Sequence, residues 1–463
     1  MSKQISLLII FLTATASLIS AYQRPNLIVI LTDDQGYQDV GFNGCTDIPT
    51  PNLDKLAKNG VKFTDGYVSY PVCGPSRAGL LTGRYQDRFG FTTNPTIDPK
   101  NPKAGLPIEE ETIAQVLSKA GYKSAIIGKW HMGTHPKFHP HRRGFDHFFG
   151  FLAGGLNYMP ENLTLNDLSE VTRKWQWYSM KVERDGETVE IDDYLTDELT
   201  DAATAFIDQQ VDAQNPFFLY LAYNAPHAPL QATEKYLSRF PDIEDKDRRT
   251  YAAMVSCVDD GVGRVMKTLS KRGILEDTIV VFLSDNGGAI SKNASSNGPL
   301  RGAKSDLYEG GIRVPFAMQW LGTIPGNLTY TEPVISLDIF STIAAITEVE
   351  ISPDRPLDGV NLIPYLTGKN LGSPHDQLFW RKWEQQGMAV RSSSTKLVAN
   401  VKRNNQNHAV YDLESDISER KNIRWKSPDK TQQLIDAWEK WNKQMKDRAF
   451  PTLGTDNWWE HNL

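Results

Sequence analysis

One short segment of the chain carries a cysteine in a setting that could be reactive. Residues 71–85 read PVCGPSRAGLLTGRY and contain Cys73, one of three cysteines in 463 residues. A thioredoxin-type redox site would have a second cysteine in place of Ser76 and a tryptophan in place of Val72. Redox exchange is therefore excluded here. A buried structural thiol is the ordinary alternative for a lone cysteine, but the adjoining Pro-Ser-Arg, which leads from a loop into a helix, argues against it.

Four other segments place polar side chains directly after short apolar runs. Residues 26–31, 123–127, 217–222 and 278–283 are apolar and rich in β-branched or aromatic residues, as strands covered on both faces are. They are followed by TDDQG, GKWH, YNAPH and SDNGG. Each run alone is more simply interpreted as a core strand that ends in a solvated turn. Because all four end in residues of catalytic type, we predict that they meet at one edge of a sheet.

Helical patterns separate these predicted strands. Residues 51–59, 111–120, 194–210 and 251–271 carry apolar side chains at helical spacing, and the first of them is followed by Gly60. Strand–helix alternation predicts a layered α/β domain with a mostly parallel central sheet. Ligands of such sheets bind at the carboxyl ends of the strands, which is where the polar residues stand.

The pattern changes towards the C-terminus. QLFWRKW, MAVRSSSTKLVAN and HAVYDL have the alternation or turn endings of antiparallel strands, and TQQLIDAWEKWNKQM is an amphipathic helix. We interpret the tryptophans of that helix as packing residues rather than a sugar platform. The chain is therefore divided into a signal peptide (1–21), a catalytic domain (22–368) and a smaller C-terminal α+β subdomain (369–463).

Composition and the N-terminus limit the classes of partner. Residues 5–19 are an apolar run too short for a membrane span, and small residues follow up to Ala21, so we expect an exported periplasmic or extracellular protein without a membrane anchor. A net charge of −6 disfavours nucleic acid and anionic membranes. An anionic substrate would need a locally basic pocket. Three cysteines are too few for a disulfide framework, although Cys45 and Cys257 could pair.

The motifs and their order resemble a known family. Cys-x-Pro-Ser-Arg at residues 73–77 is followed by LTGR, GKWHMG, RRGFDHFFG, APHAP, SDNGG and LRGAKSDLYEGGIRVPF. This arrangement resembles the type I sulfatases from residue 25 to the YDLESD segment. RYQDRFGF and the overall length are most similar to bacterial sulfatases of sulfated glycans, including the carrageenan-sulfatase branch. The resemblance implies an alkaline-phosphatase-like fold and hydrolysis of sulfate esters on a sulfated oligo- or polysaccharide.

In that family a formylglycine-generating or anaerobic sulfatase-maturing enzyme oxidises the cysteine to formylglycine, so the resemblance implies such a partner. The hydrated aldehyde offers two hydroxyls on one carbon. One attacks sulfur, and the second later expels sulfate, which a plain serine could not do.

The resemblance also implies roles for individual residues. The implied ligands of Ca²⁺, for which Mg²⁺ could substitute, are Asp33, Asp34, Cys73 as formylglycine, Asp285 and Asn286. The implied catalytic residues are the nucleophile Cys73, its support Arg77, the sulfate-binding Lys129 and Lys304, His131 as helper of the second step, and His227 beside the leaving oxygen.

One basic segment is predicted to contact substrate. THPKFHPHRRG, residues 134–144, follows the strand that leads to Lys129, so we expect a basic lip over the pocket mouth that binds neighbouring sulfates. The predicted substrate-binding residues are His139, His141, Arg142 and Arg301. An equally weighted alternative is a solvated loop with Arg143 packed against the C-terminal subdomain.

Two rival functions stay open. Phosphoester or phosphonate ester hydrolases share the scaffold, although the zinc-dependent ones would need histidine where this chain has Asn286. The other rival is a non-catalytic protein that binds sulfated glycans, and against it no motif position is visibly degraded.

Overall fold

The computed structural model describes residues 24–382, 387–400, 408–453 and 459–460. The predicted signal peptide at residues 1–21 lies outside these ranges. Within them, no helix is both long enough and apolar enough to cross a membrane.

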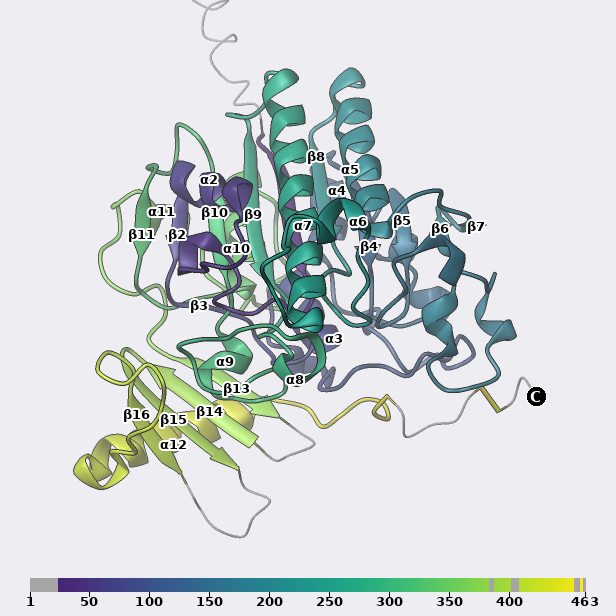
Figure 1. Ribbon diagram of the computed structural model, residues 1–463. Coiled ribbons are helices and arrows are strands. Elements are labelled where there is room, and N and C mark those ends of the chain that lie inside the picture. The colour runs from purple at the N-terminus through teal and green to yellow at the C-terminus, as the bar shows by residue number, and fades with distance from the viewer. Residues whose placement is uncertain (1–23, 383–386, 401–407, 454–458, 461–463) are drawn as a thin grey trace, which may run out of the picture.

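A ten-stranded sheet forms the centre of the molecule, in the order β11-β2-β10-β9-β1-β8-β4-β5-β6-β7 (Figure 1). Its central strands β9, β1, β8, β4 and β5 all pair in parallel. Their bounds are Thr278–Ser284 (β9), Asn26–Thr32 (β1), Phe217–Ala222 (β8), Lys123–Lys129 (β4) and His147–Phe151 (β5). The flanking strands are β2 (Val61–Phe63), β10 (Phe316–Gln319), β11 (Leu328–Tyr330), β6 (Val182–Arg184) and β7 (Glu187–Val189).

The four strands predicted from the sequence are therefore confirmed, and they are neighbours. Leu31 pairs with Ala222 of β8 on one side and with Leu283 of β9 on the other, while Gly128 of β4 also pairs with Ala222. This register aligns the carboxyl ends of all four strands. The polar residues that follow them consequently start from the same edge of the sheet.

Helices cover both faces of the middle of this sheet, which explains why its central strands are mostly apolar. Ile28 and Ile30 of β1 face a core shared with α2, α5 and α7. Leu27, Val29 and Leu31 face a second core shared with α3, α4 and α10. The bounds are Pro51–Asn59 (α2), Cys73–Thr82 (α3), Ile113–Lys119 (α4), Leu195–Asp212 (α5), Lys246–Lys271 (α7) and Leu337–Thr347 (α10).

Helix α7 begins five residues earlier than the apolar periodicity predicts. Its first turn is charged rather than apolar, and the side chain of Asp245 caps it by accepting a hydrogen bond from the backbone N–H of Arg248. The sequence pattern located the buried part of the helix and missed its solvated start.

A separate four-stranded antiparallel sheet lies beyond the main domain, in the order β13-β14-β15-β16 (Figure 1). Its strands are Leu378–Lys382, Gly387–Ser392, Thr395–Asn400 and Ala409–Asp412, and α12 (Pro428–Asn442) packs on it. Trp441 of α12 stacks on Phe379 at 5.3 Å and meets Tyr85 edge-on at 5.1 Å, so it is a packing residue. The predicted fold class is confirmed. The predicted domain boundary at residue 368 falls between α11 (Ile363–Leu366) and β13 and stays a prediction.

Buried charges join the C-terminal sheet to the main domain. Lys396 Nζ of β15 lies 2.7 Å from Glu309 Oε1 of α9 (Glu309–Ile312) and 3.0 Å from Glu419 Oε1. Burial raises the pKa of Glu309, but the charges of Lys396 and Arg313 outweigh it and hold the pKa at about 2. A lysine from the C-terminal sheet therefore neutralises a carboxylate of the main domain.

We predict that Lys396→Met lowers the free energy of unfolding by about 3–5 kcal/mol, because it removes the cation that Glu309 and Glu419 share and leaves only Glu309 with another ion-pair partner, Arg313. Chemical denaturation measures the change. The exposed Lys430→Met on α12 is the matched control and should leave the midpoint unchanged. Equal midpoints for the two variants would show that the buried network does not stabilise the fold.

Candidate active site

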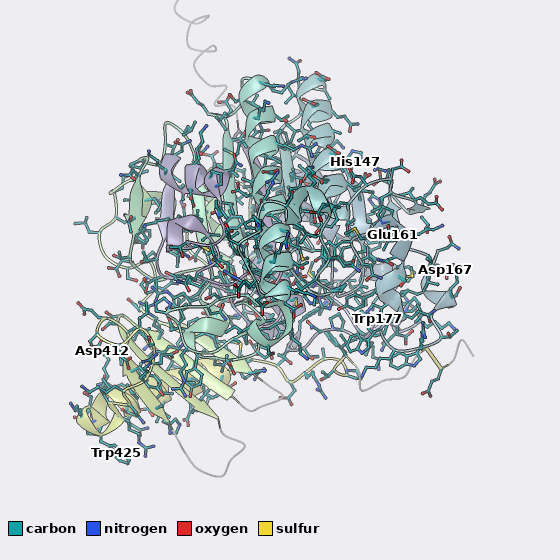
Figure 2. All side chains as sticks on the ribbon, viewed as in Figure 1. His147, Glu161, Asp167, Trp177, Asp412 and Trp425 are labelled. Atoms are coloured by element: carbon teal, nitrogen blue, oxygen red, sulfur yellow. The ribbon has the colours of Figure 1, made fainter. Side chains whose placement is uncertain are left out.

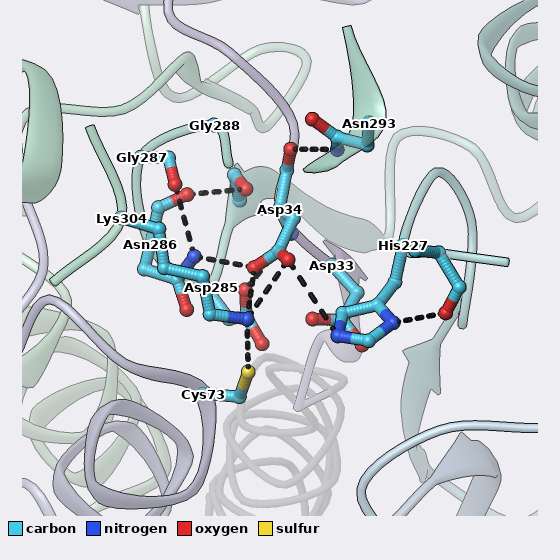
Figure 3. Close-up of polar contacts among 12 residues, drawn as sticks. Asp33, Asp34, Cys73, His227, Asp285, Asn286, Gly287, Gly288, Asn293 and Lys304 are labelled. Atoms are coloured by element: carbon cyan, nitrogen blue, oxygen red, sulfur yellow. Dashed lines mark hydrogen bonds and ion pairs between the residues drawn. The ribbon is translucent and has the colours of Figure 1, made fainter. Parts of the chain in front are cut away.

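Two aspartates follow β1 at the shared strand edge. Asp34 has a left-handed backbone (φ 62°), and its N–H lies 3.3 Å from Asp285 Oδ1 after β9. Burial raises the pKa of Asp34, but the charges of Lys304 and His227 outweigh it and set the pKa at about 2. Asp34 is thus a buried carboxylate, and it lies at the centre of the cluster drawn in Figure 3.

Cys73 is the first residue of α3, and its side chain is 1% exposed. Its Sγ lies 3.0 Å from Lys304 Nζ, and the N–H of Gly74 donates to Asn94 Oδ1 at 2.9 Å. Burial raises the pKa of the Cys73 thiol to about 12 despite the opposing charges of Lys129 and Lys304. The unmodified side chain is therefore a neutral thiol at a helix N-terminus, where the backbone favours an anion.

Arg77 lies one turn further along α3 and is fully buried. Its Nε donates to Asp285 Oδ2 at 2.9 Å, and its Nη1 donates to the carbonyl of Lys129 at 3.0 Å. Arg77 was expected to hold the modified cysteine. In the structure it ties α3 to the ends of β9 and β4, and so fixes where Cys73 stands relative to both strands.

Two lysines flank the nucleophile position, each paired with an aspartate. Lys129 Nζ lies 2.5 Å from Asp33 Oδ2. Lys304 Nζ lies 2.8 Å from Asp34 Oδ2 (Figure 3). Lys304 also contacts Cys73, so it bridges an acidic ligand candidate and the thiol. Two ammonium groups at this position can bind an anionic substrate group.

Two histidines complete the cluster. His227 Nε2 lies 3.6 Å from Asp34 Oδ2, and its Nδ1 donates to the carbonyl of Ala228 at 2.5 Å. His131 has a left-handed backbone (φ 58°), and neither ring nitrogen has a hydrogen-bond partner among the described residues. Burial and the charge of Lys129 hold the pKa of His131 well below its ordinary value. His131 is therefore a buried neutral base.

The donor set fits a hard divalent cation. Metal-ligating atoms of Asp33, Asp34, Cys73 and His227 lie within 4.8 Å of one another. Asp33 Oδ1 and Asn286 Oδ1 are buried acceptors without a hydrogen-bond partner in the described part of the chain. Buried oxygens left unsatisfied cost free energy unless a cation binds them.

His227 lies within this cluster, and the other two expected ligands lie directly against it. Asp285 Oδ1 accepts from the Asp34 N–H, and Asn286 Nδ2 donates to Asp34 Oδ1 at 2.7 Å. The Asn286 Oδ1 has no partner among the described residues, and the expected ligand set stays a prediction.

Two rings of the predicted basic lip have acidic partners, and the lip itself stays a prediction. His139 Nε2 lies 2.6 Å from Glu183 Oε1, and His141 Nε2 lies 3.3 Å from Asp185 Oδ1, so acidic residues of the β6–β7 hairpin partner both rings. The His139 ring also packs on Phe148 of β5, and its partner Glu183 pairs with Gly150 of the same strand. Arg142 is exposed in the same segment.

Two further arginines and the cysteines also differ from expectation. Arg143 is buried but donates to the carbonyls of residues 106, 107 and 110 in the main domain, not to the C-terminal subdomain. Arg301 Nη1 donates to the carbonyl of Glu419 at 2.8 Å and so joins the loop before α9 to the C-terminal subdomain. All three cysteines are free, so Cys45 and Cys257 do not pair.

Sequence reasoning missed Tyr178 and Asn293. A Cβ on Gly155 would lie 2.7 Å from the Tyr178 ring and hydroxyl, so that ring lies against the segment just beyond β5. Asn293 Nδ2 donates to the carbonyl of Asp34 at 3.0 Å. Neither residue follows an apolar run, so the strand pattern that located the other site residues could not locate these two.

Comparisons with known proteins agree with this geometry. The sulfatase family model matches residues 25–349, and the model for the C-terminal part of N-sulphoglucosamine sulphohydrolase matches residues 303–447. N-acetylgalactosamine-6-sulfatase of Mus musculus is 36% identical over 366 residues, 76% of this chain and 68% of the relative. The uncharacterized sulfatase YdeN of Escherichia coli K12 is 33% identical over 77% of this chain and 68% of its own.

A solved structure is similar over almost the whole chain. Ps i-CgsB, in complex with k-i-k-neocarrahexaose, has a TM-score of 0.87 and 36% sequence identity, and the match covers 95% of this chain and 98% of that one. The family match spans every strand end that contributes to the Cys73 cluster. The chain therefore belongs to the sulfatase family, as a type I sulfatase and sulfuric ester hydrolase.

Proposed function

We propose that this enzyme removes sulfate from a sulfated oligo- or polysaccharide, with Cys73 converted to formylglycine and one divalent cation, calcium or in its place magnesium. The observation that carries the proposal is the position of Cys73. This residue begins α3, and its Sγ lies 3.0 Å from Lys304 Nζ and within 4.8 Å of the ligand atoms of Asp33 and Asp34. A structural thiol would have no need of this surrounding charge.

The side chains of the site suit an anionic ester. Lys129 and Lys304 bind the sulfate oxygens and balance the charge that grows on them as the ester bond breaks. Formylglycine would supply a hydrated aldehyde and the cation would supply a Lewis acid, held by Asp33, Asp34, Asp285 and Asn286. His227 Nε2 stands beside Asp34, where the imidazolium form would give a proton to the leaving alcohol, although burial lowers the pKa of His227 to about 3. His131, buried and neutral, is the proposed helper of the second half of the reaction.

The glycan as substrate is supported by the similar proteins. One relative is a sulfatase of N-acetylgalactosamine 6-sulfate by name, and Ps i-CgsB was solved with a carrageenan oligosaccharide. We extend this to a sulfated galactan such as carrageenan. A formylglycine-generating or anaerobic sulfatase-maturing enzyme is the required partner, and export follows from the apolar leader.

The direct test is sulfate release from defined carrageenan and chondroitin sulfate oligosaccharides. Turnover of 4-nitrophenyl phosphate and of a phosphonate monoester is measured alongside, because these esters are substrates of the rival class of hydrolases. Sulfate release at a kcat/KM far above that for both phosphorus esters supports the proposal. Faster turnover of a phosphorus ester would move the enzyme to the rival class. Glycan binding without any release of sulfate would indicate a non-catalytic glycan-binding protein.

Conversion of Cys73 is checked by mass spectrometry. In enzyme made together with a maturing enzyme, we predict that the peptide containing residues 71–77 is about 18 Da lighter than its cysteine form, because a thiol becomes an aldehyde. Cys73→Ala, which has no heteroatom on Cβ to be oxidised, should keep the fold and lose turnover. Full activity in a preparation that holds only unmodified cysteine would contradict the proposal.

The metal is checked by elemental analysis. We predict one calcium or magnesium ion per chain, since the unsatisfied donors are oxygens, and loss of activity on chelation with recovery when calcium is added. Two zinc ions per chain would instead indicate the phosphatase type of site.

The role of Lys304 is checked by substitution. We predict that Lys304→Ala lowers kcat about 10²- to 10³-fold, because it removes one preorganised partner of the developing negative charge. Lys292→Ala is the matched control, since Lys292 is an exposed lysine on the neighbouring α8 (Ile290–Asn293). An effect on KM alone would restrict Lys304 to ground-state binding.

A further inference from the structure

An exposed tryptophan stands on the segment that connects β5 to β6. Trp175 precedes the 3-10 helix η7 (Gln176–Ser179), and half of its side chain is exposed (50%). Its backbone is left-handed (φ 69°), which is uncommon for a bulky residue. Packing into the core therefore does not explain why a tryptophan stands at this position.

The indole of Trp175 is supported from behind by other aromatic rings. Its centroid lies 5.0 Å from that of Trp177, which is buried, and 6.3 Å from that of Tyr178, which it meets nearly edge-on. Trp177 in turn packs against Trp459 at 6.0 Å. The free part of Trp175 is therefore a firm apolar surface, since the rings behind it limit its rotation.

Tyr178 connects this surface to the active site. Its ring and hydroxyl lie against Gly155, and the Nε2 of His131 lies against the preceding Gly154: a Cβ on these glycines would be 2.7 Å and 2.6 Å from those groups. Burial raises the pKa of Tyr178, and the charge of Lys304 acts on it in the opposite direction. A short path of contacting groups therefore runs from the buried His131 to the exposed Trp175.

The surroundings of Trp175 are basic. Arg173 and Lys174 are both exposed, and Lys174 Nζ lies 5.2 Å from the centroid of the Trp175 ring. Neither forms an ion pair with any residue that the structure describes. They differ in this from His139 and His141, whose rings are partnered by carboxylates.

We propose that Trp175, supported by Trp177 and flanked by Arg173 and Lys174, is a binding subsite for a sugar ring of the substrate chain beyond the ring that loses its sulfate. The apolar C–H face of a pyranose packs on an indole, and sulfates on adjacent sugars pair with the two cations. The subsite rests on the proposed function, because it takes the substrate to be a sulfated glycan chain.

The test compares long and short substrates. Trp175→Ala is expected to lower kcat/KM for a neocarrageenan hexasaccharide about tenfold more than it lowers kcat/KM for 4-methylumbelliferyl sulfate. The additional loss on the hexasaccharide should come from a higher KM, with kcat unchanged. Trp175→Phe keeps an aromatic face and should recover most of the loss. If chondroitin sulfate hexasaccharide is the better substrate of the unchanged enzyme, it takes the place of the carrageenan probe.

Trp425→Ala is the matched control. Trp425 is 76% exposed and stacks with Arg424 at 4.1 Å, but it lies on the C-terminal subdomain, at the opposite end of the molecule from Trp177 (Figure 2). Trp425→Ala should leave kcat/KM unchanged for both substrates. Equal losses on hexasaccharide and aryl sulfate for Trp175→Ala would overturn the subsite while leaving the sulfatase intact.

Failure of the proposed function gives a different result. If the unchanged enzyme releases no sulfate from any glycan, binding of the same hexasaccharide is measured by isothermal titration calorimetry. A dissociation constant about tenfold higher for Trp175→Ala than for Trp425→Ala would support the subsite, and equal constants would overturn it.

Discussion

The contacts of Lys304 hold the active site together. Its Nζ lies 2.8 Å from Asp34 Oδ2 and 3.0 Å from Cys73 Sγ, and so it joins the end of β1 to the start of α3. The neighbouring ion pairs give the site equal numbers of buried negative and positive side chains. The three carboxylates are Asp33, Asp34 and Asp285, and the three cations are Arg77, Lys129 and Lys304. A neutral set can be buried, whereas either half alone could not. A divalent cation added to this set makes the site positive and therefore receptive to a sulfate ester.

Much of the fold could be predicted because burial on both faces leaves a visible trace. β1 and β8 are continuous apolar runs, and both were located to within one residue. β5 was not predicted, because the first four of its five residues HFFGF end the RRGFDHFFG segment, which the sequence analysis interprets only as a motif. The strand ends that carry Asp33, Lys129, His227 and Asp285 could also be located, since parallel strands align their ends. What the sequence could not show was the layering within the cluster, where Asp285 supports Asp34.

The basic segment at residues 134–144 shows where local sequence fails. Its histidines suggested free positive charge, but their partners Glu183 and Asp185 come from a hairpin about 40 residues further along. Tyr178 and Trp175 were missed for the related reason that a long irregular connection carries no periodicity. Both cases concern contacts between segments distant in the chain. Such contacts decide which charges and rings stay available to a ligand.

The loop that carries Lys304 is fastened from the C-terminal side. Arg301 donates to the carbonyl of Glu419, Lys382 Nζ donates to the carbonyl of Ser305, and Glu309 is paired with Lys396. During translation these partners leave the ribosome about 320 residues after Cys73. At about 5–20 residues per second, the interval is roughly 15 to 60 s. A thiol that is 1% exposed in the folded chain is enclosed only once these contacts form, so an enzyme that modified Cys73 would meet it most readily during this interval.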